Sequence, residues 1–272
     1  MKNARFIFYP LLLLTLSASL TSCKSEFEKI RSSGDPQLLY DKAQAYYQEK
    51  SYQTAQSLFE LVISSFRGKK EGEDIYYKYA YTFYYLGDYI LAANYFKTFA
   101  QTYSVSPLRE EAEFMIAYCN YQLSPSFRLD QEYTNLAIAS FENFIVLFPE
   151  SPRAAECNRL IDELRAKLEK KAYEEGKLYF HVRQYQAAMN SFENLLKDFP
   201  ETSDAEEVRY MIYKASYLRA ANSVIEKRKE RFEDTVKIID EFLYRFPKSG
   251  YKGELEAVRK EITVKIKQLE NV

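Results

Sequence analysis

The sequence contains no tryptophan, one histidine, seven glycines and eight prolines among its 272 residues. So few glycines and prolines exclude a turn-rich β-sandwich or barrel, which needs these residues at its many turns. Because His181 is the single histidine, a catalytic triad, a His-rich metal site and a histidine acid–base pair are almost excluded. There is no glycine-rich phosphate loop. These absences favour a helical binding protein that is not an enzyme.

The balance of charged residues argues against a second class of protein. Lysine and arginine number 38 and aspartate and glutamate 39, which leaves a formal net charge of −1. If Lys2 and Arg5 leave with an N-terminal targeting segment, the balance becomes 36 − 39 = −3. A protein that binds nucleic acid through a general basic field is therefore not expected. The residues present in excess are aromatic, since tyrosine contributes 25 positions and phenylalanine 19.

The first 22 residues are typical of a lipoprotein signal peptide. Lys2 and Arg5 form a positive start, and residues 6–16 form an apolar stretch too short to span a bilayer comfortably. Residues 20–23 read Leu-Thr-Ser-Cys, which resembles the bacterial lipobox. By that resemblance Cys23 becomes the first residue of the mature protein and carries several acyl chains, which anchor it stably. The alternative is a plain secretory signal followed by an unrelated cysteine.

Residues 23–35 are polar and lack the spacing of a core helix, so they are predicted to be a lipidated tether. In lipoproteins of well-studied Gram-negative bacteria, an aspartate after the modified cysteine retains the protein in the inner membrane. Lys24 stands at that position instead. A lysine at this position would permit transfer to the outer membrane. The lipid on Cys23 is the one attached group expected, with no other cofactor and no metal.

One block of residues recurs along the chain: an aromatic residue, a small residue three positions later and a bulky apolar residue four positions further. The copies are Tyr52/Ala55/Phe59, Tyr89/Ala92/Phe96, Tyr185/Ala188/Phe192, and the weaker Thr134/Ala137/Phe141 and Phe232/Thr235/Ile239. The later copies end in Phe-Pro-x-Ser/Thr, at residues 148–151, 199–202 and 246–249. Proline stops one helix, and the hydroxyl is placed to cap the next. Each copy is therefore predicted to be a helix pair with a short turn.

This arrangement resembles the tetratricopeptide repeat (TPR). The resemblance implies an all-α fold, a right-handed superhelical solenoid of about five TPR-like helix pairs, with residues 252–270 as a C-terminal capping helix. The tryptophan of that family is missing here, and the spacing exceeds its ideal length. An extended loop at 123–132 and long helices at 152–181 and about 203–226 take up the excess. The charged segment 226–231 is predicted to be a solvated loop, with a docking surface as the alternative.

Five such units behind a lipobox resemble the BamD family, the lipoproteins of the outer-membrane β-barrel assembly machinery (BAM complex). The more specific local signals are Tyr40-Asp41-Lys42-Ala43-Gln44 and Leu129-Asp130-Gln131. The resemblance implies a lipid-anchored scaffold, not an enzyme, on the periplasmic face of the outer membrane. By the same resemblance it would bind a BamA-like POTRA-containing barrel protein, other assembly lipoproteins and unfolded outer-membrane proteins. Residues 36–150 (units 1–3) would be the substrate-binding half. Residues 151–272 (units 4–5 and the cap) would be the partner-docking half.

A stripe of aromatic side chains follows the first helices of units 1–3, on a different face from the residues that close each pair. Steps of three or four residues keep such side chains on one side of a helix. The stripe comprises Tyr40, Tyr47, Tyr77, Tyr81, Tyr84, Tyr85, Phe114, Tyr118 and Tyr121. By resemblance to the repeat family these positions line a concave groove, which suits an extended, aromatic-rich peptide such as an unfolded barrel strand. The alternative is that the rings are core or inter-repeat packing.

The matching positions of units 4 and 5 are more basic and less aromatic, which suits a folded protein partner. The predicted docking residues are Tyr173, Lys177, Phe180, Arg209 and Arg219. Cys119 and Cys157 are expected to be buried free thiols, with a single disulfide as the alternative. His181, near the end of the long helix, is expected to complement the helix dipole.

Other functions stay open at this point. One is a different periplasmic TPR lipoprotein, such as a pilotin or a cell-wall coordinator. Another is a SusD-like glycan-binding lipoprotein, although those chains are much longer and sugar platforms usually use tryptophan. The enzyme alternative is a helical lytic transglycosylase, which needs a catalytic glutamate in a loop-built cleft. No motif in the sequence supports that site.

Overall fold

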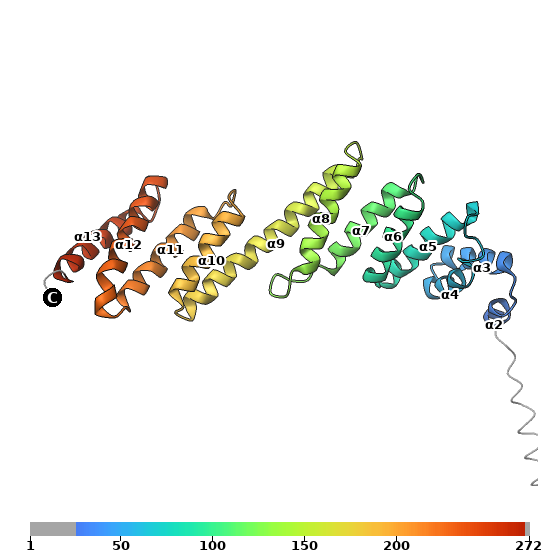
Figure 1. Cartoon of the computed structure of the whole chain (residues 1–272), viewed down its shortest axis with the longest axis horizontal. Coiled ribbons are helices and arrows are strands. Elements are labelled where there is room, and N and C mark those ends of the chain that lie inside the picture. Colours follow the sequence, from blue (N-terminus) through green and yellow to red (C-terminus); the bar gives the residue numbers. More distant parts are fainter. Residues whose placement is uncertain (1–25, 270–272) are drawn as a thin grey trace, which may run out of the picture. The chain divides into compact units, whose positions relative to one another are not determined.

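The computed structural model describes residues 26–269, and every regular element within that range is an α-helix (Figure 1). The helices are α2 (Glu26–Arg31), α3 (Pro36–Gln48), α4 (Tyr52–Val62), α5 (Lys70–Leu86), α6 (Tyr89–Thr102), α7 (Arg109–Leu123), α8 (Glu132–Leu147), α9 (Ala154–His181), α10 (Tyr185–Asp198), α11 (Ala205–Ala221), α12 (Ile225–Arg245) and α13 (Lys252–Leu269). This confirms the all-α prediction, the long helix α9 and the final helix α13. None of these described helices is long and apolar enough to cross a membrane.

The chain divides into two compact units. The first comprises residues up to Leu123 together with Ala139–Pro149, and the second comprises Ser124–Ile138 together with the residues from Glu150 onward. Within the first unit, consecutive helices from α3 to α7 pack on one another, and within the second unit the same is true from α9 to α13. The handedness of a superhelix and the division into a substrate half and a partner half stay predictions.

The recurring small and bulky residues close the helix pairs. The small residues Ala55, Ala92, Ala137 and Ala188 and the bulky residues Phe59, Phe96, Phe141 and Phe192 have no exposed surface. In the second unit, the approach of α10 to α9 requires a glycine. A Cβ atom on Gly176 would lie 2.5 Å from Cε1 of Phe192, closer than real Cβ contacts. A glycine here therefore lets the two helices meet.

The hydroxyl residues of the Phe-Pro-x-Ser/Thr segments mark helix boundaries, as predicted. The side-chain oxygens of Ser151, Thr202 and Ser249 each accept a hydrogen bond from the backbone N–H two residues later, at 3.1, 3.1 and 3.0 Å. These turns lead directly into α9, α11 and α13. Ser106 makes the same contact at 3.0 Å before α7, although no Phe-Pro dipeptide precedes it. The hydroxyl is thus the more general boundary signal.

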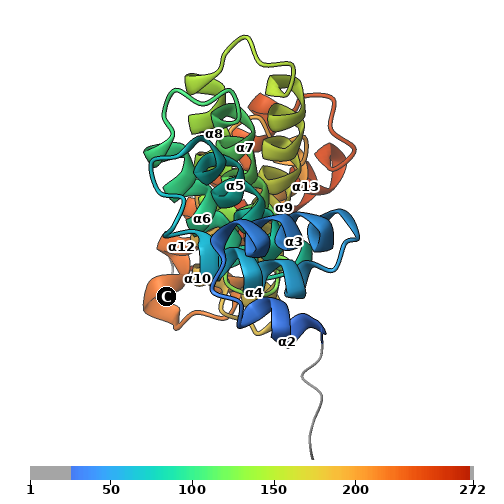
Figure 2. The same ribbon diagram turned by 90° about the vertical axis from the view of Figure 1, so that its right-hand side faces the viewer.

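The predicted tether is partly structured, so the expectation for residues 26–31 is wrong. These residues form α2, which packs on α3 (Figure 2). Ile30 is only 7% exposed, and the ring of Phe27 lies 6.4 Å from that of Tyr46, edge to face. Two apolar side chains spaced three residues apart are enough to hold this short helix against its neighbour.

The charged segment 226–231 is also not the predicted loop, because α12 begins at Ile225 and runs through it. Its charges alternate at helical spacing: Lys227 pairs with Glu230 at 3.4 Å, and Lys229 with Glu233 at 4.0 Å. Such pairs stabilise a helix surface. Helix α11 ends at Ala221, whereas its end was predicted at about residue 226.

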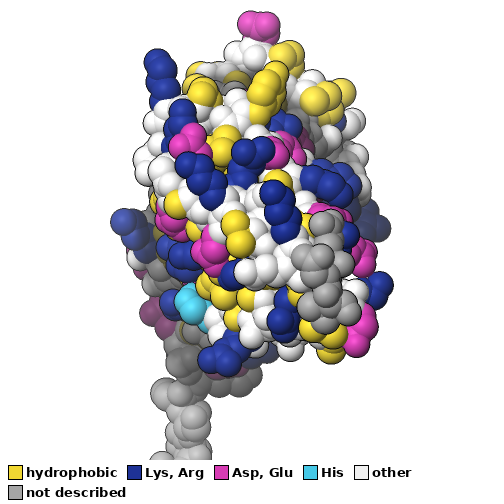
Figure 3. Space-filling view, turned by 90° about the vertical axis from the view of Figure 1, so that its left-hand side faces the viewer, with side chains coloured by type: hydrophobic (Ala, Val, Ile, Leu, Met, Phe, Trp, Pro, Cys, Tyr) yellow, Lys and Arg dark blue, Asp and Glu magenta, His cyan; other side chains and the backbone are white. Residues whose placement is uncertain are grey.

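Cys119 and Cys157 are buried free thiols, which is their predicted state. Burial raises the pKa of the Cys119 thiol to about 12, so it is unreactive at neutral pH. Among residues 26–269 no group of histidine, cysteine and carboxylate side chains has the geometry to hold a metal ion. On the face shown in Figure 3, basic side chains are interspersed with acidic and apolar ones.

Candidate functional site

The predicted aromatic stripe belongs to the first unit and consists mainly of half-buried rings. Tyr85 is the most open of them, at 47% exposed. The other partly buried members are Tyr40, Tyr47, Tyr77, Tyr81, Tyr84, Tyr118 and Tyr121. A half-buried tyrosine packs one side of its ring and leaves the other side available to a ligand.

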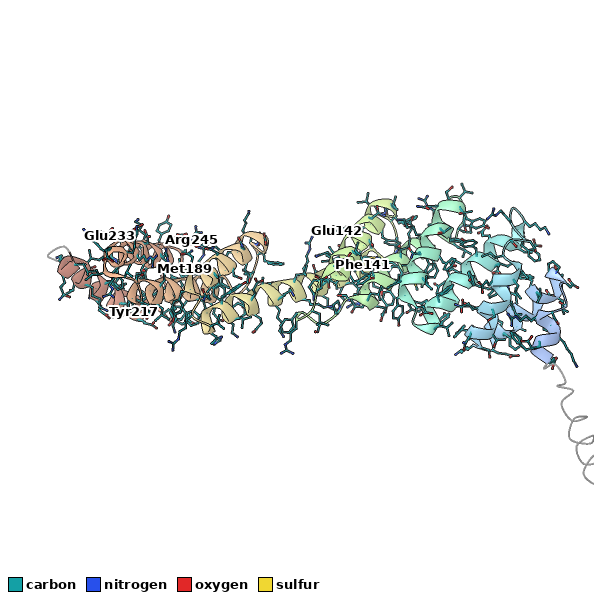
Figure 4. The ribbon with its side chains drawn as sticks, turned by 60° about the horizontal axis from the view of Figure 1, so that its bottom comes forward. Phe141, Glu142, Met189, Tyr217, Glu233 and Arg245 are labelled. Atoms are coloured by element: carbon teal, nitrogen blue, oxygen red, sulfur yellow. The ribbon has the colours of Figure 1, made fainter. Side chains whose placement is uncertain are left out.

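Phe114 is an exception, and its predicted place in the groove is wrong. It is only 3% exposed. Its ring centre lies 6.0 Å from that of Phe141 and 5.8 Å from that of Phe144. These two phenylalanines lie three residues apart on α8, where Figure 4 labels Phe141, and both pack against Phe114. Phe114 is therefore a core residue with almost no surface for a peptide.

The rings form a continuous network from α3 to α7. Tyr85 stacks on Tyr52, with ring centres 4.3 Å apart and planes inclined by 16°. Tyr81 stacks against Tyr85 at 5.7 Å, and Tyr84 lies 6.3 Å from Tyr118. Tyr52 was predicted only as a repeat-packing residue. Its position as the first residue of α4, next to the end of α3, is what brings it to the stripe.

The hydroxyl groups of two stripe tyrosines already have partners on the next helix pair. Tyr81 donates to Oε1 of Glu111 at 2.8 Å, and Tyr40 donates to Oδ2 of Asp74 at 3.2 Å. Neither carboxylate was predicted to be a partner of a stripe tyrosine, and Glu111 was expected only to lie at the surface. The sequence feature that could have located these carboxylates is an acidic residue about one repeat length after the tyrosine. These hydroxyls join consecutive helix pairs, so a peptide would meet their rings more readily than their hydrogen-bonding groups.

Burial also shifts the acid–base behaviour of these tyrosines. Burial raises the pKa of Tyr81 well above its usual value, and hydrogen bonding to Tyr77 and the charge of Glu111 raise it further. Burial, with smaller effects of Tyr118 and Tyr89, raises the pKa of Tyr84 to about 12. Both hydroxyls therefore keep their protons to a higher pH than an ordinary tyrosine does, and that of Tyr81 is the donor to Glu111.

One charged cluster interrupts the stripe. Nζ of Lys78 lies 2.9 Å from Oδ1 of Asp74, and it donates to Oε1 of Gln44 at 2.6 Å. Gln44 also donates to Asp74. The Lys78 ammonium lies 5.9 Å from the ring centre of Tyr47. The stripe therefore presents a cation beside its rings at the α3–α5 contact.

The predicted docking residues of α9 are held by their own neighbours. The Tyr173 hydroxyl donates to Oε1 of Glu207 at 2.5 Å. Lys177 pairs with Glu174 at 3.3 Å, and its ammonium lies 5.2 Å from the ring centre of Tyr173. Phe180 packs against the core cluster of α10 and α11. These three side chains form part of the surface of the second unit, but each one also has a packing role.

Arg209 lines a pocket of about 350 Å³ formed by α10, α11 and α12. Its Nη1 atom lies 3.4 Å from Oε1 of Glu241. Glu241 also pairs with Arg245, which is labelled in Figure 4, at 3.0 Å. Burial and the charge of Arg245 lower the pKa of Arg209. The other lining residues are Glu193, Leu196, Lys197, Ile212, Ile238, Glu241 and Phe242. Arg219 is partly buried on α11 and does not line this pocket.

A family model described as "YfiO: Outer membrane lipoprotein" matches residues 32–231, well over half of the chain. The chain belongs to this family. The match confirms the resemblance to BamD proteins and the outer-membrane location. Members of this lipoprotein family are not known as enzymes. Cys23 itself, the predicted site of the lipid, lies outside the described residues.

Individual relatives of this YfiO-family chain agree with that assignment. The outer membrane protein assembly factor BamD of Haemophilus influenzae is 24% identical over 240 residues, which is 85% of this chain and 88% of that protein. The factor of the same name from Rickettsia prowazekii is 24% identical over 200 residues, 74% of this chain and 80% of that protein. A solved TPR repeats protein from Bacteroides fragilis covers 87% of this chain and 98% of its own, at 15% identity and a TM-score of 0.37.

Proposed function

We propose that this chain is a lipid-anchored scaffold of the outer-membrane β-barrel assembly machinery. The observation that most supports the proposal is the match of most of the chain to outer membrane lipoproteins whose relatives are named assembly factors. The lipid on Cys23 is the one attached group that this role needs. A scaffold needs binding surfaces and no catalytic centre, and the described helices offer two such surfaces, one in each unit.

The first surface is the aromatic stripe, and its proposed ligand is an unfolded outer-membrane protein. Strands of such proteins are rich in aromatic side chains where they meet the membrane interface. The stacked rings of Tyr52 and Tyr85 provide rigid contact area at low entropy cost. Lys78, which is paired with Asp74, adds a polar group beside the rings. An extended peptide with alternating aromatic and polar residues fits this surface.

The second surface is the pocket beside Arg209, and its proposed ligand is the POTRA region of a BamA-like barrel protein. Apolar side chains of Leu196, Ile212 and Phe242 line the pocket together with charged ones. Glu241 is shared between Arg209 and Arg245, so a carboxylate of the partner can take its place on Arg209. Arginine beside an apolar pocket is typical of residues that dominate binding energy.

A matched pair of substitutions tests the aromatic stripe. Tyr85→Ala should weaken binding of an aromatic-rich strand peptide about fivefold or more, because the loss of a contact aromatic typically costs over 1 kcal/mol. Tyr244→Ala, at an 87% exposed tyrosine of the second unit, is the control and should leave peptide affinity unchanged. Equal peptide affinities of the two variants would contradict a role of the stripe.

For the partner surface, Arg209→Ala should weaken binding of an isolated POTRA region about tenfold. Lys248→Ala removes an exposed cation of the same unit and serves as the control. Both measurements use circular dichroism to verify that the helices are intact. A POTRA affinity that is the same for both variants would remove Arg209 from the docking surface.

A further inference from the structure

Side-chain hydrogen bonds to backbone carbonyls hold the loop between α7 and α8 in place. Gln131 is 6% exposed, and its amide donates hydrogen bonds to the carbonyls of Ser126 and Leu129, both at 2.9 Å. From α9, Lys171 donates to the carbonyl of Leu129 at 2.7 Å and to that of Phe127 at 3.3 Å. These contacts fix residues 126–131 in one conformation within the second unit.

Two cations lie over the ring of Phe127, one from the loop and one from α9. The guanidinium carbon of Arg128 lies 5.1 Å from the ring centre of Phe127, and Nζ of Lys170 lies 4.9 Å from the same centre. Neither cation forms an ion pair with a carboxylate of residues 26–269. Two like charges gathered in this way repel each other, and an anion bound between them would relieve the repulsion.

A groove of about 570 Å³ opens beside these cations. Its walls are Phe127, Arg128, Lys170, Lys171, Glu174, Glu175 and Leu178. Lys177 neutralises Glu174 at 3.3 Å, so three cations of the wall face one unpaired carboxylate, Glu175. Leu178 on the wall and Leu129 next to Arg128 are each 60% exposed. The groove therefore combines positive charge with an open apolar edge.

We propose that this groove binds the headgroup of an anionic phospholipid in the membrane that carries the chain. The phosphate would lie between Arg128 and Lys170, and the two leucines would meet the boundary of the acyl chains. Basic and apolar side chains together are the combination by which peripheral proteins adhere to anionic bilayers. Members of the family are outer membrane lipoproteins, so the membrane that would carry the chain contains phospholipids.

Vesicle flotation tests the proposal with the chain from Lys24 onward, which keeps every described helix and lacks the lipid. The vesicles contain phosphatidylcholine alone or an equal mixture with phosphatidylglycerol. We expect binding to the mixed vesicles only. The double variant Arg128→Gln/Lys170→Gln should lower the partition coefficient about thirtyfold, since each basic residue near an anionic surface contributes a factor of about five. Arg159→Gln/Lys248→Gln, which removes the same charge elsewhere in the second unit, should lower it far less.

A second variant, and competition by inorganic phosphate, distinguish phospholipid binding from binding of a small anion. Leu129→Ser/Leu178→Ser keeps the charge and should also weaken binding to the mixed vesicles. Equal losses in the two arginine–lysine doubles, or binding that ignores phosphatidylglycerol, would overturn the proposal. Release from the vesicles by millimolar inorganic phosphate, without a change in overall ionic strength, would show a small-anion site and would also overturn it. None of these results depends on the proposed POTRA or substrate contacts.

Discussion

Tyrosine hydroxyls link one helix pair to the next in both units. Tyr81 reaches Glu111, Tyr40 reaches Asp74 and Tyr173 reaches Glu207, at sequence separations of 30, 34 and 34 residues. Each bond joins the first helix of one pair to the first helix of the following pair. Because the acceptor is a carboxylate, such a bond stabilises more than one between neutral groups. The stripe tyrosines therefore have a structural role beside any role in binding.

Tyr81→Phe tests this link, since it removes the hydroxyl and keeps the ring. We expect the free energy of unfolding to decrease by about 1–2 kcal/mol, because Glu111 loses the hydrogen bond from Tyr81 in a partly buried place. Denaturant unfolding of the full chain measures the change. Tyr244→Phe, at an exposed ring, is the control and should be neutral. An unchanged stability of Tyr81→Phe would mean that water replaces the bond without loss.

At the scale of elements, contact between paired helices depends on a small residue opposite a large one. Gly176 of α9 and Phe192 of α10 show this most sharply, because the ring lies where a Cβ atom would be. The repeat pattern in the sequence predicted the helix pairs, the long helix α9 and the hydroxyl-marked boundaries. The prediction for residues 226–231 was wrong, because their charge was interpreted as typical of a loop. In the structure, ion pairs at i,i+3 and i,i+4 spacing stabilise α12 there.

Gly176→Ala should lower the free energy of unfolding by about 1–3 kcal/mol, because Phe192 is fully buried and its ring must shift. Gly253→Ala in α13 is the matched control, since no atom lies within 4 Å of the added methyl group. Alanine favours helix over glycine, so the control should gain about 0.5–1 kcal/mol. Thermal and denaturant unfolding compare the two. A stabilising Gly176→Ala would contradict the close contact of α9 and α10.

At the scale of the whole molecule, the abundance of tyrosine makes stability depend on alkaline pH. Burial raises the folded-state pKa of Tyr84 and of Tyr213 to about 12 in each case. In the unfolded chain tyrosine ionises near pH 10. The unfolded state therefore loses protons that the folded state keeps, and this favours unfolding. The stability contribution is fully present below about pH 10 and decreases as the pH rises towards 12.

We expect the thermal unfolding midpoint to be nearly constant from about pH 8 to 9 and to decrease above pH 10. Absorbance of tyrosinate at about 295 nm should rise in step with the loss of helical circular dichroism. Lysine deprotonation in the same range weakens surface ion pairs, which contribute little. Complete tyrosine ionisation near pH 10 in a chain that remains helical would contradict the burial of these rings.

The candidate site was predictable from the sequence only in part. Helical spacing placed the stripe tyrosines on one face, and the structure finds most of them half-buried there. Spacing along one helix says nothing about the neighbouring pair, so it missed the burial of Phe114 by Phe141 and Phe144. The partners of the hydroxyls were missed for the same reason. The pairing of Arg209 with Glu241 depends on α11 and α12 together.

The central claim is that this YfiO-family chain is a scaffold for outer-membrane protein assembly. Affinity purification of the lipidated full chain from outer membranes in mild detergent tests it most directly. The account predicts co-purification of a POTRA-containing barrel protein, at lower yield with Arg209→Ala than with Lys248→Ala. Recovery of cell-wall enzymes or of glycan transporters alone, with no POTRA-containing protein, would contradict it.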